Sequence, residues 1–250
     1  MSRSLCALGV LLLIVAVPGR VVAADNDRAV KAARLNAELA FGYLKVDDVT
    51  TAREKVEKAL IENPKDAVVH TAAALVYERL QEKDRADSHY RTAMQLDSRN
   101  PDLQNNYAVF LCRNARPVEG QRMFEQAARN PAYATPEVAY TNAAVCARGA
   151  RDLKTADAYL ARALEVRPEF PDALLQRADV ALSLGDGIVA RASLEHYFKV
   201  SHATPEALSL GARLERTLGD PIAASEYLRR LQQQFPNSPA AREARSTEVP

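Results

Sequence analysis

A repeat of about 34 residues constrains the fold of this 250-residue chain more than any other feature of its sequence. Small residues recur at intervals of 34, 34, 36, 34 and 34, at Ala52, Ala86, Gly120, Ala156, Ala190 and Ala224. A large apolar residue follows each of them by four positions, and in the first four units a small residue follows three positions later. Because spacings of four and three share one helix face, each unit predicts a helix with a narrow apolar face.

The first half of each unit predicts a second helix. Small residues such as Ala73, Ala108 and Ala143 lie within it and allow close approach of the two helices of a unit. Pro101 and Pro171 open two of the units, at a position where the missing N–H costs nothing. A helical hairpin of this kind buries its apolar face only by stacking on the next one. The alternative, an irregular all-α domain, fits six registered units poorly.

The composition agrees with stacked helices. The chain has only 9 Gly, no Trp and 6% aromatic residues, and much of its apolar fraction is Ala, the best helix former. Its 33 basic and 32 acidic residues give no electrostatic attraction toward nucleic acid or an anionic membrane.

The N-terminal residues 1–23 read as a secretory signal peptide with cleavage before Ala24. Arg3 provides the positive start, and the apolar run Ala7–Val17 is too short for a comfortable membrane span. An uncleaved N-terminal anchor is the alternative. Cys6 precedes the apolar run, whereas the acylated Cys of a bacterial lipoprotein follows it, so we do not expect a lipid anchor.

The period and the small–large–small pattern, closed by Pro64, Pro168 and Pro236 in three units, resemble the tetratricopeptide repeat. The resemblance implies an all-α, right-handed superhelix of about six helix–turn–helix units within residues 33–240. Their predicted bounds are 33–66, 67–100, 101–136, 137–170, 171–204 and 205–238, after an N-terminal extension at 24–32 and before a flexible tail at 241–250.

In this repeat, positions 2, 5, 9, 12 and 13 usually face a groove that receives a peptide from a partner. The resemblance therefore implies a groove lined by Phe41, Leu44, Val68, Thr71, Leu75, Arg79, Asn105, Val109, Arg113, Thr141, Val145 and Arg148. For each of them the alternative is packing against neighbouring helices. The mixture of apolar residues with isolated charges suits a peptide with alternating anchors.

Two cysteines remain once the signal peptide is removed. Cys112 and Cys146 lie late in the first helix of adjacent units, at nearly equivalent positions. In an exported protein such an even pair indicates a disulfide. Two free buried thiols are the alternative.

The stretches Asn105–Cys112 and Ala139–Ala147 resemble the type IV pilus biogenesis and stability proteins, often called the PilF or PilW family. The resemblance implies a partner-binding scaffold that promotes assembly or outer-membrane targeting of the pilus secretin. Because the lipid-modified Cys usual in that family is missing, we expect a periplasmic protein peripheral to the outer membrane. The alternative is a generic periplasmic adaptor for another envelope assembly or secretion machine.

No motif indicates catalysis. The chain lacks GxSxG, HExxH and a phosphate-binding Gly loop. Four histidines, His70, His89, His196 and His202, are dispersed over the repeats without ligand-like spacing, which predicts exposed or packing side chains. We therefore expect no enzyme activity, cofactor, metal, nucleic acid or small-molecule substrate.

Overall fold

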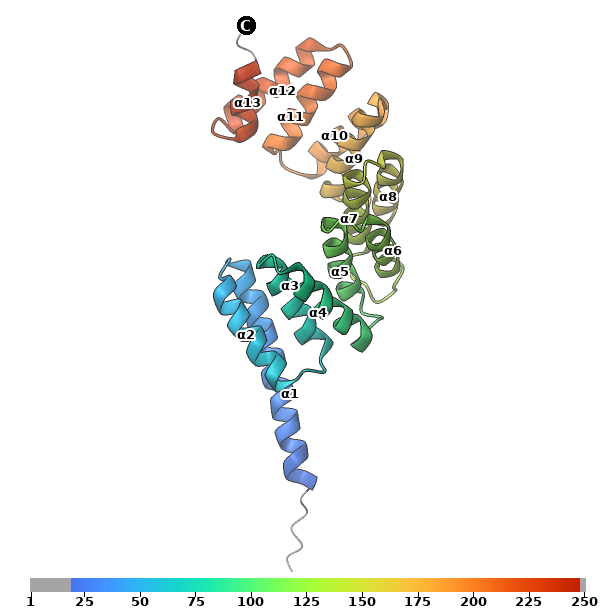
Figure 1. The fold of residues 1–250 in the computed structure, drawn as a ribbon. Helices are drawn as coiled ribbons and strands as arrows, with labels where there is room; N and C mark the ends of the chain where they lie inside the picture. Colours follow the sequence, from blue (N-terminus) through green and yellow to red (C-terminus); the bar gives the residue numbers. More distant parts are fainter. Residues whose placement is uncertain (1–18, 248–250) are drawn as a thin grey trace, which may run out of the picture. The chain divides into compact units, whose positions relative to one another are not determined.

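The computed structural model describes residues 19–247, with side chains described for residues 26–246. This part of the chain forms α-helices and contains no strand, which confirms the predicted all-α fold (Figure 1). The helices are α1 Gly19–Lys45, α2 Val49–Glu62, α3 Ala67–Arg79, α4 Lys83–Leu96, α5 Pro101–Arg113, α6 Pro117–Ala128, α7 Pro136–Gly149, α8 Leu153–Val166, α9 Pro171–Leu184, α10 Gly187–Val200, α11 Pro205–Thr217, α12 Pro221–Gln234 and α13 Pro239–Thr247.

The helices belong to two compact units, Met1–Leu96 with α1 to α4 and Asp97–Pro250 with α5 to α13. Within the N-terminal unit, α1 packs on α2 and α3 on α4 as helical hairpins. Within the C-terminal unit, the hairpins are α5 with α6, α7 with α8, α9 with α10 and α11 with α12. Within each unit, the second helix of a hairpin contacts the first helix of the next, as α2 does with α3 and α6 with α7, which is the stacking that the repeat predicts.

Most of the predicted signal peptide, with Cys6, lies outside the described residues. Helix α1 runs without a break from Gly19 through the predicted cleavage site and the extension at 24–32 to Lys45. Within the described residues, no helix combines the length and the apolar character that a membrane crossing requires.

An aspartate starts the second helix in four of the six hairpins. Its carboxylate accepts the N–H of the residue three positions later, at 2.9–3.1 Å. These pairs are Asp48 with Thr51, Asp152 with Thr155, Asp186 with Val189 and Asp220 with Ala223. Since this bond satisfies an N–H that the helix leaves unpaired, the turn between the two helices is encoded locally.

The recurring small residues lie where helices cross. Ala52, Ala86, Ala156 and Ala190 are fully buried. Such residues allow helix backbones to approach closely, so the high Ala content is a consequence of the many helix contacts in a stack.

The C-terminal residues differ from the prediction. We expected a flexible tail at 241–250, but α13 occupies residues 239–247, so that expectation is wrong for most of the segment. The Ser238 hydroxyl accepts the Ala241 N–H at 3.1 Å and begins the helix. Ala241 is fully buried in a cluster with Leu208 and Leu231. A short amphipathic helix therefore covers the end of the C-terminal unit, because it buries apolar residues that a frayed tail would leave exposed.

Candidate functional site

In the N-terminal unit, the residues predicted to line the groove come from α1 and α3. Phe41, Leu44 and Leu75 are half-buried, and Val68 is 37% exposed. The exposed Arg79 places its guanidinium 3.1 Å from the Asp47 carboxylate in the turn after α1. Such an exposed ion pair contributes little stability. The Asp47 carboxylate also neutralises Arg79, the one cation predicted for the groove in the N-terminal unit.

Two predicted groove residues are unavailable to a partner. Thr71 and Thr141 are buried, and their hydroxyls donate to the carbonyls of Ala67 and Glu137, four residues earlier. A threonine in a helix can satisfy its hydroxyl in this way without any partner. Position five of these repeats is therefore a packing position here, contrary to the prediction from the family pattern.

In the C-terminal unit, the prediction concerns α5 and α7. The Asn142 side chain donates to the Asn105 Oδ1 at 3.1 Å, which links the two helices. Val109 packs against the buried core, whereas Val145 is 44% exposed and Arg113 is exposed. Of the predicted residues, Val145 is thus an apolar side chain presented to solvent.

A charged row continues across the first helices of the next units. The Arg148 guanidinium on α7 donates to the Asp179 Oδ2 on α9 at 2.8 Å. The second carboxylate oxygen of Asp179 accepts from Arg213 on α11. These contacts place the three side chains on one surface of adjacent helices. Arg148 was predicted, whereas Asp179 and Arg213 were missed. Both residues occupy position nine of their units, so extending the groove pattern to units five and six would have included them.

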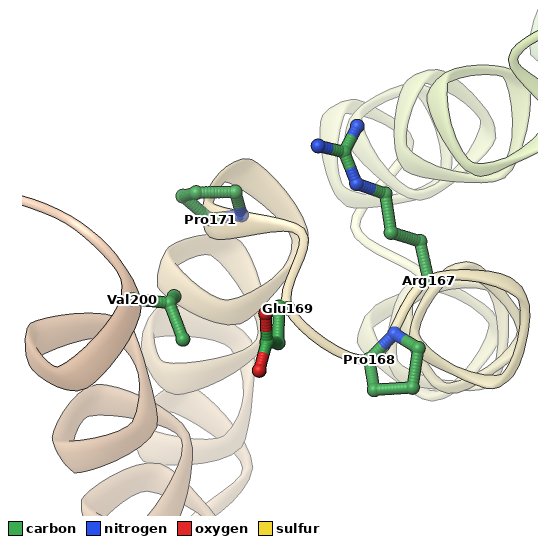
Figure 2. A pocket seen from close by; sticks show the side chains of 5 residues that line it. All are labelled: Arg167, Pro168, Glu169, Pro171 and Val200. Carbon is green, nitrogen blue, oxygen red and sulfur yellow. The ribbon is translucent and has the colours of Figure 1, made fainter.

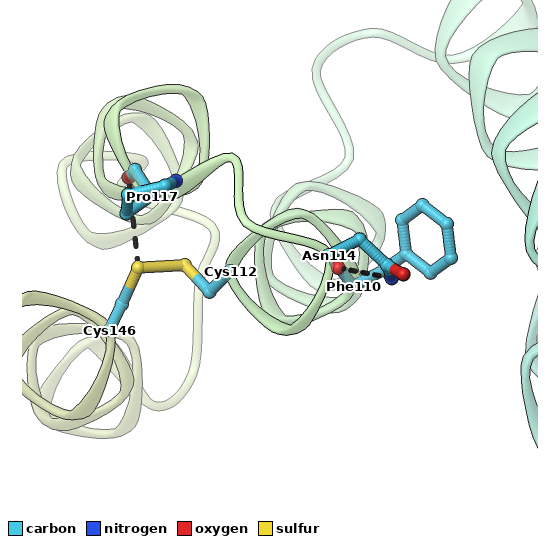
Figure 3. The surroundings of a disulfide bond; sticks show 5 residues. All are labelled: Phe110, Cys112, Asn114, Pro117 and Cys146. Atoms are coloured by element: carbon cyan, nitrogen blue, oxygen red, sulfur yellow. Dashed lines mark hydrogen bonds between the residues drawn. A yellow bond between two sulfur atoms is a disulfide. The ribbon is translucent and has the colours of Figure 1, made fainter. Parts of the chain in front are cut away.

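Cys112 on α5 and Cys146 on α7 form a disulfide, with their Cα atoms 5.5 Å apart (Figure 3). The Cys146 Sγ also lies 3.7 Å from the Pro117 carbonyl oxygen. A sulfur in a disulfide carries no proton, so this is a contact and not a hydrogen bond. The bridge joins the first helices of units three and four, the same two helices that carry Asn105 and Val145.

Gly120 stands where other units have alanine because of this bridge. A Cβ at Gly120 would lie 2.3 Å from the Cys112 Sγ and 2.9 Å from the Ala108 carbonyl oxygen.

Gly120→Ala would gain up to about 1 kcal/mol of helix propensity. Overpacking costs about 1–3 kcal/mol and outweighs that gain. We expect a lower midpoint of urea unfolding for Gly120→Ala. Gly149→Ala, where a Cβ meets nothing within 4 Å, is the matched control; an equal or higher midpoint for Gly120→Ala would contradict the steric argument.

A histidine pair in the N-terminal unit was also missed. The Nδ1 atoms of His70 on α3 and His89 on α4 lie 2.9 Å apart. The His70 Nε2 lies 3.0 Å from the Pro64 carbonyl oxygen, which can only accept. His70 therefore carries its proton on Nε2, and its Nδ1 accepts from His89. Burial, then the neighbouring His70 and Arg85, lower the pKa of His89 to about 4.

This pair could have been found by comparing positions 4 and 23 of unit two, which face each other across the hairpin. In the part of the chain with described side chains, no group of three or more His, Cys, Asp or Glu is placed to hold a metal. The two imidazoles are thus a partly buried polar pair, hydrogen-bonded to each other and through His70 to the Pro64 carbonyl.

One surface depression of about 480 Å³ lies at the turn between α8 and α9 and is lined by Arg167, Pro168, Glu169, Pro171 and Val200 (Figure 2). Arg167 and Glu169 point in different directions (Figure 2), and Arg167 instead pairs with the buried Glu137 at 3.3 Å. Since these residues include no nucleophile paired with a base, the depression is not a candidate catalytic site.

Comparison with known proteins agrees with the repeat. A family model described as tetratricopeptide repeat matches residues 67–100, the bounds predicted for unit two. The type IV pilus assembly protein PilF of Pseudomonas aeruginosa is 27% identical over 235 residues, which are 92% of this chain and 93% of that protein.

Solved structures show the same likeness. The crystal structure of PilW, described as a widely conserved type IV pilus biogenesis factor, has a TM-score of 0.76 and 30% identity, covering 85% of this chain and 97% of that one. A Pseudomonas aeruginosa PilF structure has a TM-score of 0.73 and 26% identity, covering 89% and 99%. The fold shared with these relatives is a protein-interaction scaffold. The chain belongs to the PilF and PilW family of type IV pilus biogenesis proteins built from tetratricopeptide repeats.

Proposed function

We propose that this protein promotes type IV pilus biogenesis by binding the pilus secretin in the periplasm and assisting its assembly or its targeting to the outer membrane. The observation that carries the proposal is similarity to PilW over 97% of that chain at 30% identity. The protein is related to pilus biogenesis factors along nearly its whole length, and the secretin is the partner that the family resemblance implies.

The structure supports a binding role through its exposed helix faces. Val145 and Arg148 on α7 and Arg213 on α11 present apolar and cationic groups on the first helices of two hairpins. Such surfaces in stacked repeats bind a segment of another protein. The periplasmic location rests on the signal-peptide pattern at residues 1–23 and on the cysteine pair, which suits an oxidising compartment.

Deletion of the gene is expected to reduce detergent-resistant secretin multimers and to abolish surface pili and twitching. Multimers are measured by immunoblot of unheated envelope samples, and pili by shearing and electron microscopy. Complementation with the full chain should restore both. A chain starting at Ala24, which lacks the predicted signal peptide, is the matched control and should restore neither, since it remains in the cytoplasm.

The outcomes separate the parts of the proposal. Normal pili in the deletion strain would overturn the pilus function. Absent pili with normal secretin multimers would overturn the secretin role and leave a function elsewhere in the pilus machine. Full complementation by the Ala24 form would overturn the periplasmic location.

A further inference from the structure

The charged row on α7, α9 and α11 has more cations than anions. Asp179 lies between Arg148 and Arg213 and accepts from both. Arg216 lies one turn after Arg213, on the same face of α11. Among these four residues, three guanidinium groups therefore accompany one carboxylate, which pairs with Arg148 and Arg213. The acidic residues Asp172 and Glu206 belong to the first turns of α9 and α11. Seven residues of helix, about 10 Å, separate each of them from the row.

The two paired arginines can still bind another anion. Their side chains are 38% and 61% exposed, and each guanidinium has five N–H donors in a planar fork. One hydrogen bond from each goes to Asp179. Asp179 holds the two side chains in place, which lowers the entropic cost of ordering them when a ligand carboxylate arrives. This is the arrangement that suits bidentate recognition of an acidic side chain.

An apolar contact lies beside the charged row. Val145 precedes Arg148 by three residues, so the two side chains share one face of α7, and Val145 is 44% exposed. Leu182, three residues after Asp179, is half-buried against the core of the C-terminal unit. A bound segment therefore meets a cationic row and an adjoining apolar patch.

We propose that this face, defined by Val145, Arg148, Asp179, Arg213 and Arg216, binds an acidic segment within a partner protein, whose Asp or Glu side chains pair with the arginines while an apolar residue packs on Val145. The inference rests on the proposed function as a protein-binding scaffold. It specifies the chemistry of the partner, which similarity to PilF and PilW leaves open. Charge complementarity selects the partner segment.

Site-specific crosslinking in cells tests the proposal first. A photoreactive amino acid replaces Val145, and the matched control carries it at Val118, which is 79% exposed on α6. We expect Val145 to capture a protein segment with an excess of Asp and Glu, identified by mass spectrometry. A captured segment without that excess, a lipid product, or equal capture at Val118 would overturn the proposal.

Titration of the captured segment as a synthetic peptide tests the role of each charge. Reversing both arginines, Arg148→Glu with Arg213→Glu, should weaken binding about tenfold or more. Arg122→Glu, an exposed site on α6, is the control and should leave affinity unchanged. Asp179→Asn keeps an acceptor oxygen that can order the arginines but removes the negative charge that competes with the ligand, so it should tighten binding several-fold; weaker binding would overturn this role of Asp179. Circular dichroism confirms that each variant is folded.

Two further results distinguish this proposal from the proposed function. An acidic segment from a protein outside the pilus machine would support the cationic face and overturn the pilus assignment. A segment of a pilus protein that binds equally to the double-reversal variant would keep the pilus function and overturn the face. A peptide that binds only with a free C-terminal carboxylate, and not when amidated, would overturn recognition of internal acidic side chains.

Discussion

Replacing Cys112 and Cys146 together by alanine is expected to lower the free energy of unfolding of the C-terminal unit by about 3–4 kcal/mol. The two cysteines are 34 residues apart, and a crosslink over such a loop restricts the unfolded chain by about that amount. The bridge also fixes α5 against α7. Hydrogen exchange should therefore become faster in these two helices, whereas α3 and α4 in the N-terminal unit stay unchanged.

Urea unfolding with and without a reductant checks this prediction. Reduction of the natural protein should lower its midpoint nearly as far as the double alanine variant does, and the variant itself should not respond to reductant. Repeat proteins can unfold in several steps, so the transition is followed separately through exchange of α5 to α7. Two free thiols in the protein purified from the periplasm under denaturing conditions would contradict the prediction.

The hairpins could be predicted from sequence because their determinants are local. Spacing of small and large residues defines the helix faces, and an aspartate at the turn begins the second helix in four units. The tail was predicted wrongly for a related reason. Ala240, Ala241 and Ala244 have little apolar character of their own, and only contact with Leu208 and Leu231 makes helix formation favourable there.

The candidate site was predictable only in part. The position pattern indicates which helix face is exposed, and it placed Arg148 and Val145 correctly on the surface. It could not show that the Thr71 and Thr141 hydroxyls bond to their own helix. The pairing of Arg148 with Asp179 depends on the spacing of adjacent hairpins, which the sequence does not contain. Contacts between residues 31 or more positions apart were therefore the main omission.

Lowering the pH from about 6.5 to about 4 is expected to destabilise the N-terminal unit through His89. Burial, then His70 and Arg85, lower the pKa of this ring to about 4 in the folded chain, below its ordinary value of 6.5. The unfolded chain therefore binds the proton first as the pH falls. The stability is present in full above pH 6.5, declines between 6.5 and 4, and has no further loss from this group below 4.

The expected loss is about 2 kcal/mol, because solvent around the half-buried ring reduces the value that the pKa difference alone would give. Thermal unfolding of the natural protein at constant ionic strength measures this loss.

His89→Gln should flatten the dependence of stability on pH between pH 6.5 and 4. His202→Gln, which removes an exposed histidine from the C-terminal unit, should leave it unchanged. The Asp66 carboxylate has a pKa lowered from 3.8 despite burial, by its hydrogen bonds to Arg34 and Val68, and it titrates below this window. An unchanged slope in His89→Gln would show that other groups carry the acid sensitivity.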